Sequence, residues 1–141
     1  MAYAWEFFRV MSGSGPGNFH LGQEFCAWGM AIDAVGNVYV TGSYVSGTGS
    51  DYLTVKYDTN GKQLWSARYD GPSHFDIPRV IKLDQAGNVY VTGSSAGTKG
   101  FDYLTVKYDP NGNELWTARY DGPDHDTDQG QCVGPNKPLI F

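Results

Sequence analysis

The sequence has few charged residues and no cluster of basic ones. Charged side chains make up 18% of its 141 residues, and the formal net charge is −5. Nucleic-acid binding rests on neutralising phosphates with Lys and Arg, so ten scattered basic residues argue against a nucleic-acid partner. No apolar run is long enough to span a membrane, and the first residues show no basic segment followed by an apolar one. As written, the chain predicts neither a membrane span nor a signal peptide.

Cysteine is scarce and helical periodicity is absent. Cys26 and Cys132 have no C-x-x-C or zinc-ligand spacing, so we interpret them as two buried or half-buried thiols. A single disulfide between them is the alternative. No long segment repeats apolar residues with the period of a helix. Nineteen glycines and an aromatic content of 15% favour many short strands joined by tight turns.

The chain contains an internal repeat. The segments Asp33–Asp76 and Asp84–Thr127 align without gaps at an offset of 51, and 29 of the 44 aligned residues are identical. A period near 50 excludes the shorter helical repeats and fits a unit of four strands, as in a propeller blade. We therefore predict an all-β, propeller-type chain with two four-stranded antiparallel blades.

Each unit reads as a meander of four strands. The predicted strands are Gly29–Ile32, Val38–Gly42, Tyr52–Tyr57 and Leu64–Tyr69, and then Val80–Leu83, Val89–Gly93, Tyr103–Tyr108 and Leu115–Tyr120. Both faces of these strands carry bulky side chains, so each sheet needs cover on both sides. We divide the chain into a stray strand with its connection (1–28), blade 1 (29–70), blade 2 (79–121) and an off-pattern tail (122–141).

The repeated motifs resemble those of the bacterial β-propeller repeat family known as SBBP, whose units look like D-x-x-G-N-V-Y-V-T-G followed by D-Y-x-x-V-K-Y-D-x-N-G-x-x-W-x-x-R-Y-x-G. The match runs through Asp33–Gly71 and Asp84–Gly122. The resemblance implies antiparallel blades in mostly secreted or surface-associated bacterial proteins. It implies no catalytic residues. This chain departs from the family in having too few repeats for a ring.

A second resemblance concerns the turn that precedes each repeated Trp. The pattern D-x-N-G-x-x-L-W, at Asp58 and Asp109, resembles the Trp-docking motif of pyrroloquinoline-quinone propellers. That resemblance implies a turn glycine and a Trp that wedges against the next blade, although two blades could not form the quinone site. We expect structural contacts between blades from Trp65, Trp116, Tyr57 and Tyr108. Lys56, Arg68 and their copies read as inter-blade salt bridges or solvated edges, paired with repeated aspartates: Asp51, Asp58, Asp70 and their copies.

Two blades are too few for a ring, since propellers usually have four to eight. Three readings follow: head-to-tail self-association, a fragment of a longer protein, or a cap formed by Trp5–Arg9 folding back on the blades. We favour a homo-oligomer of two, three or four chains, because open sheet faces and edges invite partners.

The predicted ligand-binding surface is the end at which the second strand of each unit joins the third. The loops there are longer than the opposite turns and differ between the copies, as binding loops on a repeat scaffold do. A protein or glycan ligand would contact residues of this loop end: Tyr44, His74, Lys99, Phe101 and His125.

A metal site is a weaker prediction from the same connections. His74 and His125 occupy the same repeat position and are close in sequence to Asp76 and to alternating carboxylates. Asp124, Asp126 and Asp128 suit a hard cation such as Ca²⁺, although the glycine and distal Glu of an EF-hand loop are missing. The alternative is a polar turn with unpaired acids and no cofactor.

No arrangement of nucleophile, base or paired carboxylates indicates catalysis. We therefore interpret the chain as a non-enzymatic interaction or scaffold module. Two alternatives stay open: an enzyme whose site is assembled only in the complete ring, and a truncated or mobile gene fragment without a function of its own.

Overall fold

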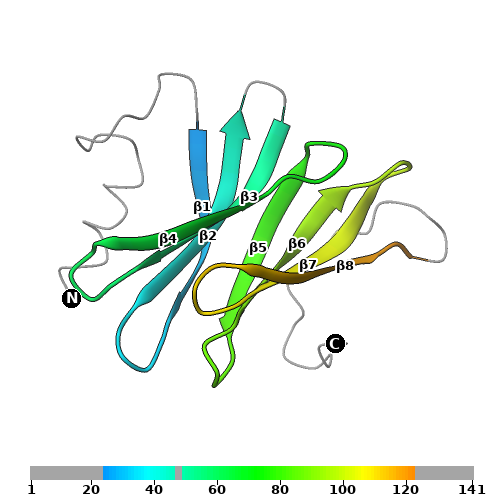
Figure 1. The fold of residues 1–141 in the computed structure, drawn as a ribbon. Coiled ribbons are helices and arrows are strands. Elements are labelled where there is room, and N and C mark those ends of the chain that lie inside the picture. Colours follow the sequence, from blue (N-terminus) through cyan, green and yellow to red (C-terminus); the bar gives the residue numbers. More distant parts are fainter. Residues whose placement is uncertain (1–23, 47–48, 123–141) are drawn as a thin grey trace.

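The computed structural model describes residues 24–46 and 49–122, and every regular element in these ranges is a strand. The strands form two antiparallel four-stranded sheets, each in sequence order from edge to edge (Figure 1). Blade 1 consists of β1 (Glu24–Ile32), β2 (Val38–Ser46), β3 (Gly49–Tyr57) and β4 (Gln63–Tyr69). Blade 2 consists of β5 (Asp76–Leu83), β6 (Val89–Ala96), β7 (Phe101–Tyr108) and β8 (Glu114–Tyr120). The predicted all-β fold with two blades is confirmed, and the two sheets do not close into a ring.

The strands lie where the sequence predicts them but extend further towards the loop end. β1 begins at Glu24 rather than Gly29, and β5 begins at Asp76 rather than Val80. In both first strands the pairing continues through a β-bulge, which lies between Ala27 and Gly29 in β1. Backbone pairing of this kind needs no apolar side chain, so the hydrophobic pattern could not reveal it.

An aspartate closes each of the short turns at the opposite end. Asp84 accepts hydrogen bonds from the backbone N–H of Asn88 at 2.9 Å and from its side-chain amide at 2.8 Å. Asp109 and Asn113 repeat this arrangement in the turn between β7 and β8. The turn glycines all have φ values between +81° and +92°, a region that side-chain-bearing residues disfavour: Gly36, Gly61, Gly87 and Gly112.

Blade 1 stacks on blade 2 through two faces of different composition. The face of blade 1 that meets blade 2 carries aromatic side chains, and we call it the tyrosine face: Tyr39, Tyr52, Trp65 and Tyr69. The facing side of blade 2 is aliphatic, and we call it the valine face: Ile81, Val89, Val91, Leu104, Val106 and Tyr108. These residues form one core cluster, within which Tyr52 is fully buried. Its burial removes a large apolar ring from water and so stabilises the stack.

Trp65 makes the most specific contact between the blades. Its indole Nε1 donates a hydrogen bond to the Pro110 carbonyl at 3.0 Å, and its ring centroid lies 6.3 Å from that of Tyr108. The ring rests against Gly112, where a Cβ would lie 2.7 Å from it. Each blade has copies of both faces, and we give the copies the same names. Trp116, the copy of Trp65, lies on the tyrosine face of blade 2, and Tyr57, the copy of Tyr108, lies on the valine face of blade 1. Both therefore lie on the outer sides of the stack, and their inter-blade contacts stay a prediction.

Cys26 differs from the expectation of a buried or half-buried thiol. It lies in the edge strand β1 and is exposed, because an edge strand has a neighbour on one side only. Cys132 lies outside the described residues. Within residues 24–46 and 49–122, no helix has the length and apolar character needed to cross a membrane.

Candidate functional site

The β2–β3 and β4–β5 connections meet at one end of the molecule, as the meander predicts (Figure 1). Ser50 in β3 forms a parallel bridge to Phe75, and its N–H donates to the His74 carbonyl at 2.9 Å. At the end of β6, the N–H of Ala96 donates to the Phe75 carbonyl at 2.8 Å. The β4–β5 connection is therefore held by backbone hydrogen bonds from both blades.

Two of the predicted ligand-binding residues, Tyr44 and His74, each contact one member of the Arg68–Asp70 ion pair. The ring of Tyr44 lies 5.3 Å from the guanidinium carbon of Arg68, and the His74 ring contacts Asp70, which is also paired with Arg68. Lys99 is exposed in the β6–β7 turn, and Phe101 begins β7 opposite Ala96. His125 lies outside the described residues.

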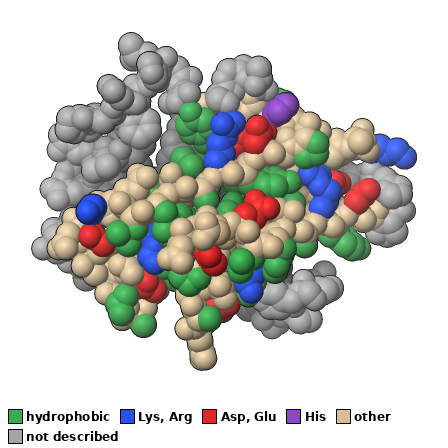
Figure 2. Space-filling model, in the orientation of Figure 1, with side chains coloured by type: hydrophobic (Ala, Val, Ile, Leu, Met, Phe, Trp, Pro, Cys, Tyr) green, Lys and Arg blue, Asp and Glu red, His purple; other side chains and the backbone are tan. Residues whose placement is uncertain are grey.

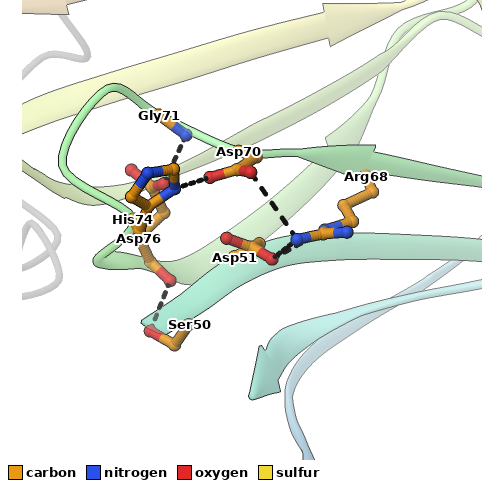
Figure 3. Close-up of polar contacts among 7 residues, drawn as sticks. All are labelled: Ser50, Asp51, Arg68, Asp70, Gly71, His74 and Asp76. Atoms are coloured by element: carbon orange, nitrogen blue, oxygen red, sulfur yellow. Dashed lines mark hydrogen bonds and ion pairs between the residues drawn. The ribbon is translucent and has the colours of Figure 1, made fainter. Parts of the chain in front are cut away.

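The predicted Ca²⁺ ligands Asp124, Asp126 and Asp128 also lie outside the described residues. Asp76, which was part of that predicted metal set, belongs to a different group of carboxylates. One oxygen from each of three aspartates lies within 4.8 Å of the others (Figure 3). The three residues come from β3, the β4–β5 connection and β5, and we call them the acidic junction: Asp51, Asp70 and Asp76.

Arg68 neutralises one side of the acidic junction. Its Nε and Nη2 lie 2.6 and 2.5 Å from Asp51 Oδ2, and Nη2 lies 3.6 Å from Asp70 Oδ2. The expectation of an inter-blade salt bridge or a solvated edge is wrong for this pair. Arg68 and Asp51 belong to neighbouring antiparallel strands of one blade, and the Asp51 side chain is only 3% exposed. Figure 2 shows the surface here, where a histidine side chain lies beside acidic and basic ones.

The carboxylates of the junction have different electrostatic surroundings. Burial raises the pKa of the Asp51 carboxyl above its ordinary value; Arg68 opposes this rise and the negative charge of Asp70 adds to it. At the more exposed Asp70, the hydrogen bond with His74, 2.8 Å long, lowers the pKa of the carboxyl. Burial therefore disfavours the charged form of the Asp51 carboxyl, and a further cation nearby would offset this cost.

Asp76 is the most buried member of the junction. It is 1% exposed, and its Oδ2 accepts a hydrogen bond from the backbone N–H of Gly71 at 2.6 Å. Only a glycine fits there, because a Cβ on Gly71 would lie 2.7 Å from Asp76 Oδ1. Among the described residues, this second oxygen has no hydrogen-bond partner.

Sequence reasoning treated Asp51 and Asp70 only as partners for basic residues. Both have aspartate copies in the second unit, Asp102 and Asp121, so they look like parts of the repeat scaffold. Asp76 aligns instead with Thr127. That departure from the repeat was the available signal that the first unit carries an additional acid at this place.

The outer faces of the stack are a second candidate surface. On the tyrosine face of blade 2, Tyr103, Trp116 and Tyr120 are 38%, 41% and 60% exposed, whereas their copies in blade 1 are buried or half-buried. On the valine face of blade 1, Met30 in the edge strand β1 is 55% exposed, whereas Val40 and Val55 in the two central strands are only 4% and 6% exposed. Exposed apolar patches of this kind mark interaction surfaces.

No family model matches the chain. The chain is 28% identical to an uncharacterized WD repeat-containing protein of Acanthamoeba polyphaga mimivirus, over 64% of this chain and 9% of that protein. This chain thus corresponds to a small part of the relative's length. Together with the two stacked sheets, the match supports a propeller-type repeat scaffold, and the closer resemblance to SBBP repeats stays a prediction. The match to the WD repeat-containing protein assigns no ligand and no reaction to this chain.

Proposed function

We propose that the chain is a non-enzymatic propeller-repeat interaction module that associates head to tail with further copies of itself. In this arrangement the tyrosine face of blade 2 packs on the valine face of blade 1 in the next copy. The observation that carries the proposal is the internal interface, in which Trp65 of one blade packs on Gly112 of the next.

The repeat supplies both halves of this interface again on the outer faces. Trp116 copies Trp65 on the tyrosine face of blade 2. Gly61 copies Gly112 in the β3–β4 turn of blade 1, and no described residue has an atom within 4 Å of the place where its Cβ would lie. A Trp116 ring from another copy would find there the kind of turn on which Trp65 already rests.

The carbonyl that accepts the indole hydrogen bond has a copy as well. Trp65 donates to the carbonyl of Pro110, whose counterpart in the β3–β4 turn of blade 1 is Thr59. The interface joins two different faces, so it propagates until a rotation closes it. Two, three or four chains would supply the four, six or eight blades common in closed rings.

Light scattering on a sizing column, over a dilution series, tests this proposal. We expect the wild-type chain to have the mass of a closed oligomer. Trp116→Ala should weaken the association at least about tenfold, since buried Trp residues dominate such interfaces. Gly61→Ala should do the same, because its methyl group would occupy the place of the docked ring.

Lys99→Ala is the control, because Lys99 is exposed in the β6–β7 turn, at the opposite end of the strands from the β3–β4 turn. Its association should equal that of the wild type. A folded monomer at the highest concentration would overturn the proposal and favour the reading in which Trp5–Arg9 caps the blades. Equal weakening by all three substitutions would also contradict it.

A further inference from the structure

The buried carboxylate of Asp76 is incompletely satisfied by the described residues. Its side chain is almost completely removed from water, yet Oδ1 has no hydrogen-bond partner among them. A buried acceptor without a partner is costly, and buried polar groups in native proteins nearly always have one. The carboxylate belongs to the acidic junction, in which one oxygen of Asp76 lies within 4.8 Å of carboxylate oxygens of Asp51 and Asp70. Its surroundings therefore point to a bound cation, which would accept an electron pair from the oxygen.

The charge of the junction agrees with a divalent cation. Three carboxylates share one guanidinium, that of Arg68, and Arg68 contacts Asp51 and Asp70 but has no described contact with Asp76. Two negative charges are left when His74 is neutral. Closely grouped carboxylate oxygens are typical ligands of hard cations. The positive charge of the cation offsets the repulsion among the carboxylates.

The spacing of the junction distinguishes between the common hard cations. Ca²⁺ binds oxygens at 2.3–2.6 Å, so two of its ligand oxygens lie at most about 5.2 Å apart. Mg²⁺ binds at 2.0–2.1 Å and allows at most about 4.2 Å. Oxygens spaced up to 4.8 Å apart stay within the span of Ca²⁺. Ca²⁺ also takes six to eight oxygens, and the 40% exposure of Asp70 leaves one side open for water ligands.

We infer that the acidic junction is a Ca²⁺ site, with Asp51, Asp70 and Asp76 as its protein ligands. The ion ties β3 and the β4–β5 connection of blade 1 to the first residue of blade 2. His74 acts as a positioning residue, since its Nδ1 holds the Asp70 carboxylate at 2.8 Å. The site would stabilise the junction of the two blades and would not depend on association between copies.

The second blade offers a matched comparison within the same chain. Asp102 pairs with Arg119 at 2.6 Å, as Asp51 pairs with Arg68, but the residue that aligns with Asp76 is Thr127. Asp102→Asn therefore removes an equivalent ion pair and leaves the acidic junction intact. Asp51→Asn and Asp76→Asn remove ligands, and Asp70→Asn removes the ligand that is most exposed and least needed for folding.

The experiment is a titration of the chelator-treated 141-residue chain with CaCl₂, followed by calorimetry and by thermal unfolding. We expect a dissociation constant on the order of 10⁻⁴ M, typical of sites with few protein ligands. At about a hundredfold excess over that constant, the Tm should rise by about 5–10 °C. MgCl₂ should give a smaller rise, and NaCl at matched ionic strength should give none.

The variants decide whether the effect belongs to the junction. Asp70→Asn and Asp76→Asn should abolish the Ca²⁺-dependent rise in Tm, and Asp102→Asn should retain it. Circular dichroism without Ca²⁺ tests whether each variant is folded. If Asp76→Asn is unfolded, Asp70→Asn alone decides whether the effect belongs to the junction. No heat of binding and no shift with 10 mM Ca²⁺, an equal shift with NaCl, or an unchanged shift in Asp70→Asn would each overturn the inference.

Discussion

The indole ring of Trp65 lies against Gly112 of the neighbouring blade, so closely that a Cβ on this glycine would be 2.7 Å from the ring. The same indole donates a hydrogen bond to the Pro110 carbonyl in the same turn. One turn of blade 2 thus receives both the apolar surface and the polar group of a single side chain. Gly61, at the equivalent turn of blade 1, has no described neighbour of this kind, and the contrast makes the contact testable.

Gly112→Ala should destabilise the fold more than Gly61→Ala. Both glycines have a positive φ, +86° and +81°, so an alanine costs about 1 kcal/mol of backbone strain at either position. Only at Gly112 does the new methyl group meet the Trp65 ring, which adds about 1–3 kcal/mol of overpacking. The free energy of unfolding, from urea denaturation of monomeric samples, measures the difference. Equal costs would show that Trp65 moves away without loss.

Trp65→Ala should cost about 2–4 kcal/mol of stability, because it leaves a cavity at the blade interface and removes the hydrogen bond to Pro110. Trp116→Ala, at a side chain 41% exposed, should cost less than about 1 kcal/mol in the monomer. The comparison separates intramolecular docking from association. If Trp116→Ala destabilised the dilute monomer as strongly as Trp65→Ala, the outer tyrosine face would be packed within the chain.

Much of this architecture can be predicted from the sequence, because the four-strand unit occurs twice in it. The offset of 51 residues defines the four-strand unit, and the aspartates and glycines of the turns separate its strands. The wedge of Trp65 against the next blade was an expectation from the pattern of turn glycine and Trp. Neighbours in sequence determine the turns and strands, whereas the contact of Trp65 with a turn 45 residues away was expected only from the resemblance of the motif.

The acidic junction could not be predicted in the same way. Asp51 and Asp76 are brought together by the bridge between Ser50 and Phe75, a contact between blades that no periodicity encodes. The burial of Asp51 depends on the same packing. The sequence alone indicates an exposed residue there, because Asp51 lies near the start of a strand that follows a Gly/Ser loop. The pairing of Arg68 with Asp51 was expected between blades or at a solvated edge, and the relative shift of β3 and β4 instead places it within one blade.

Removing one hydroxyl of the buried threonine pair in blade 1 should cost more than removing its copy in blade 2. The hydroxyls of Thr41 and Thr54 lie 3.2 Å apart, and both residues are fully buried. Thr41→Val leaves the Thr54 hydroxyl without this partner, at a cost of about 1–2 kcal/mol. Thr92 forms the same bond with Thr105 at 3.2 Å, but both are only half-buried, so water can replace the lost partner.

Chemical denaturation of the variants in monomeric samples measures these costs. The double variant Thr41→Val, Thr54→Val should lose less than the sum of its two single variants, because neither hydroxyl is then left unpaired. Thr92→Val should cost less than about 0.5 kcal/mol. Additive losses in blade 1, or equal losses in both blades, would contradict the prediction that burial sets the value of this hydrogen bond.

Acid should weaken the fold partly through the turn aspartates. The side-chain amide of Asn88 donates to Asp84, and that of Asn113 to Asp109, and each hydrogen bond lowers the pKa of the carboxyl below its usual value of 3.8. The unfolded chain then binds more protons than the folded chain as the pH falls below about 4. The stability that these carboxylates contribute is therefore present above that pH and is lost as the pH falls through their lowered folded pKa values.

NMR titration of the Asp84 and Asp109 carboxyl carbons measures these pKa values directly. Asn113→Ala removes the amide that contributes most at Asp109, so the pKa of Asp109 should rise towards 3.8 while that of Asp84 stays unchanged. The Tm of this variant should fall less between pH 6 and pH 2.5 than that of the wild type, because less of its stability depends on the charged carboxylate. A wild-type Asp109 that titrates at or above 3.8 would contradict the role of the turn in acid sensitivity.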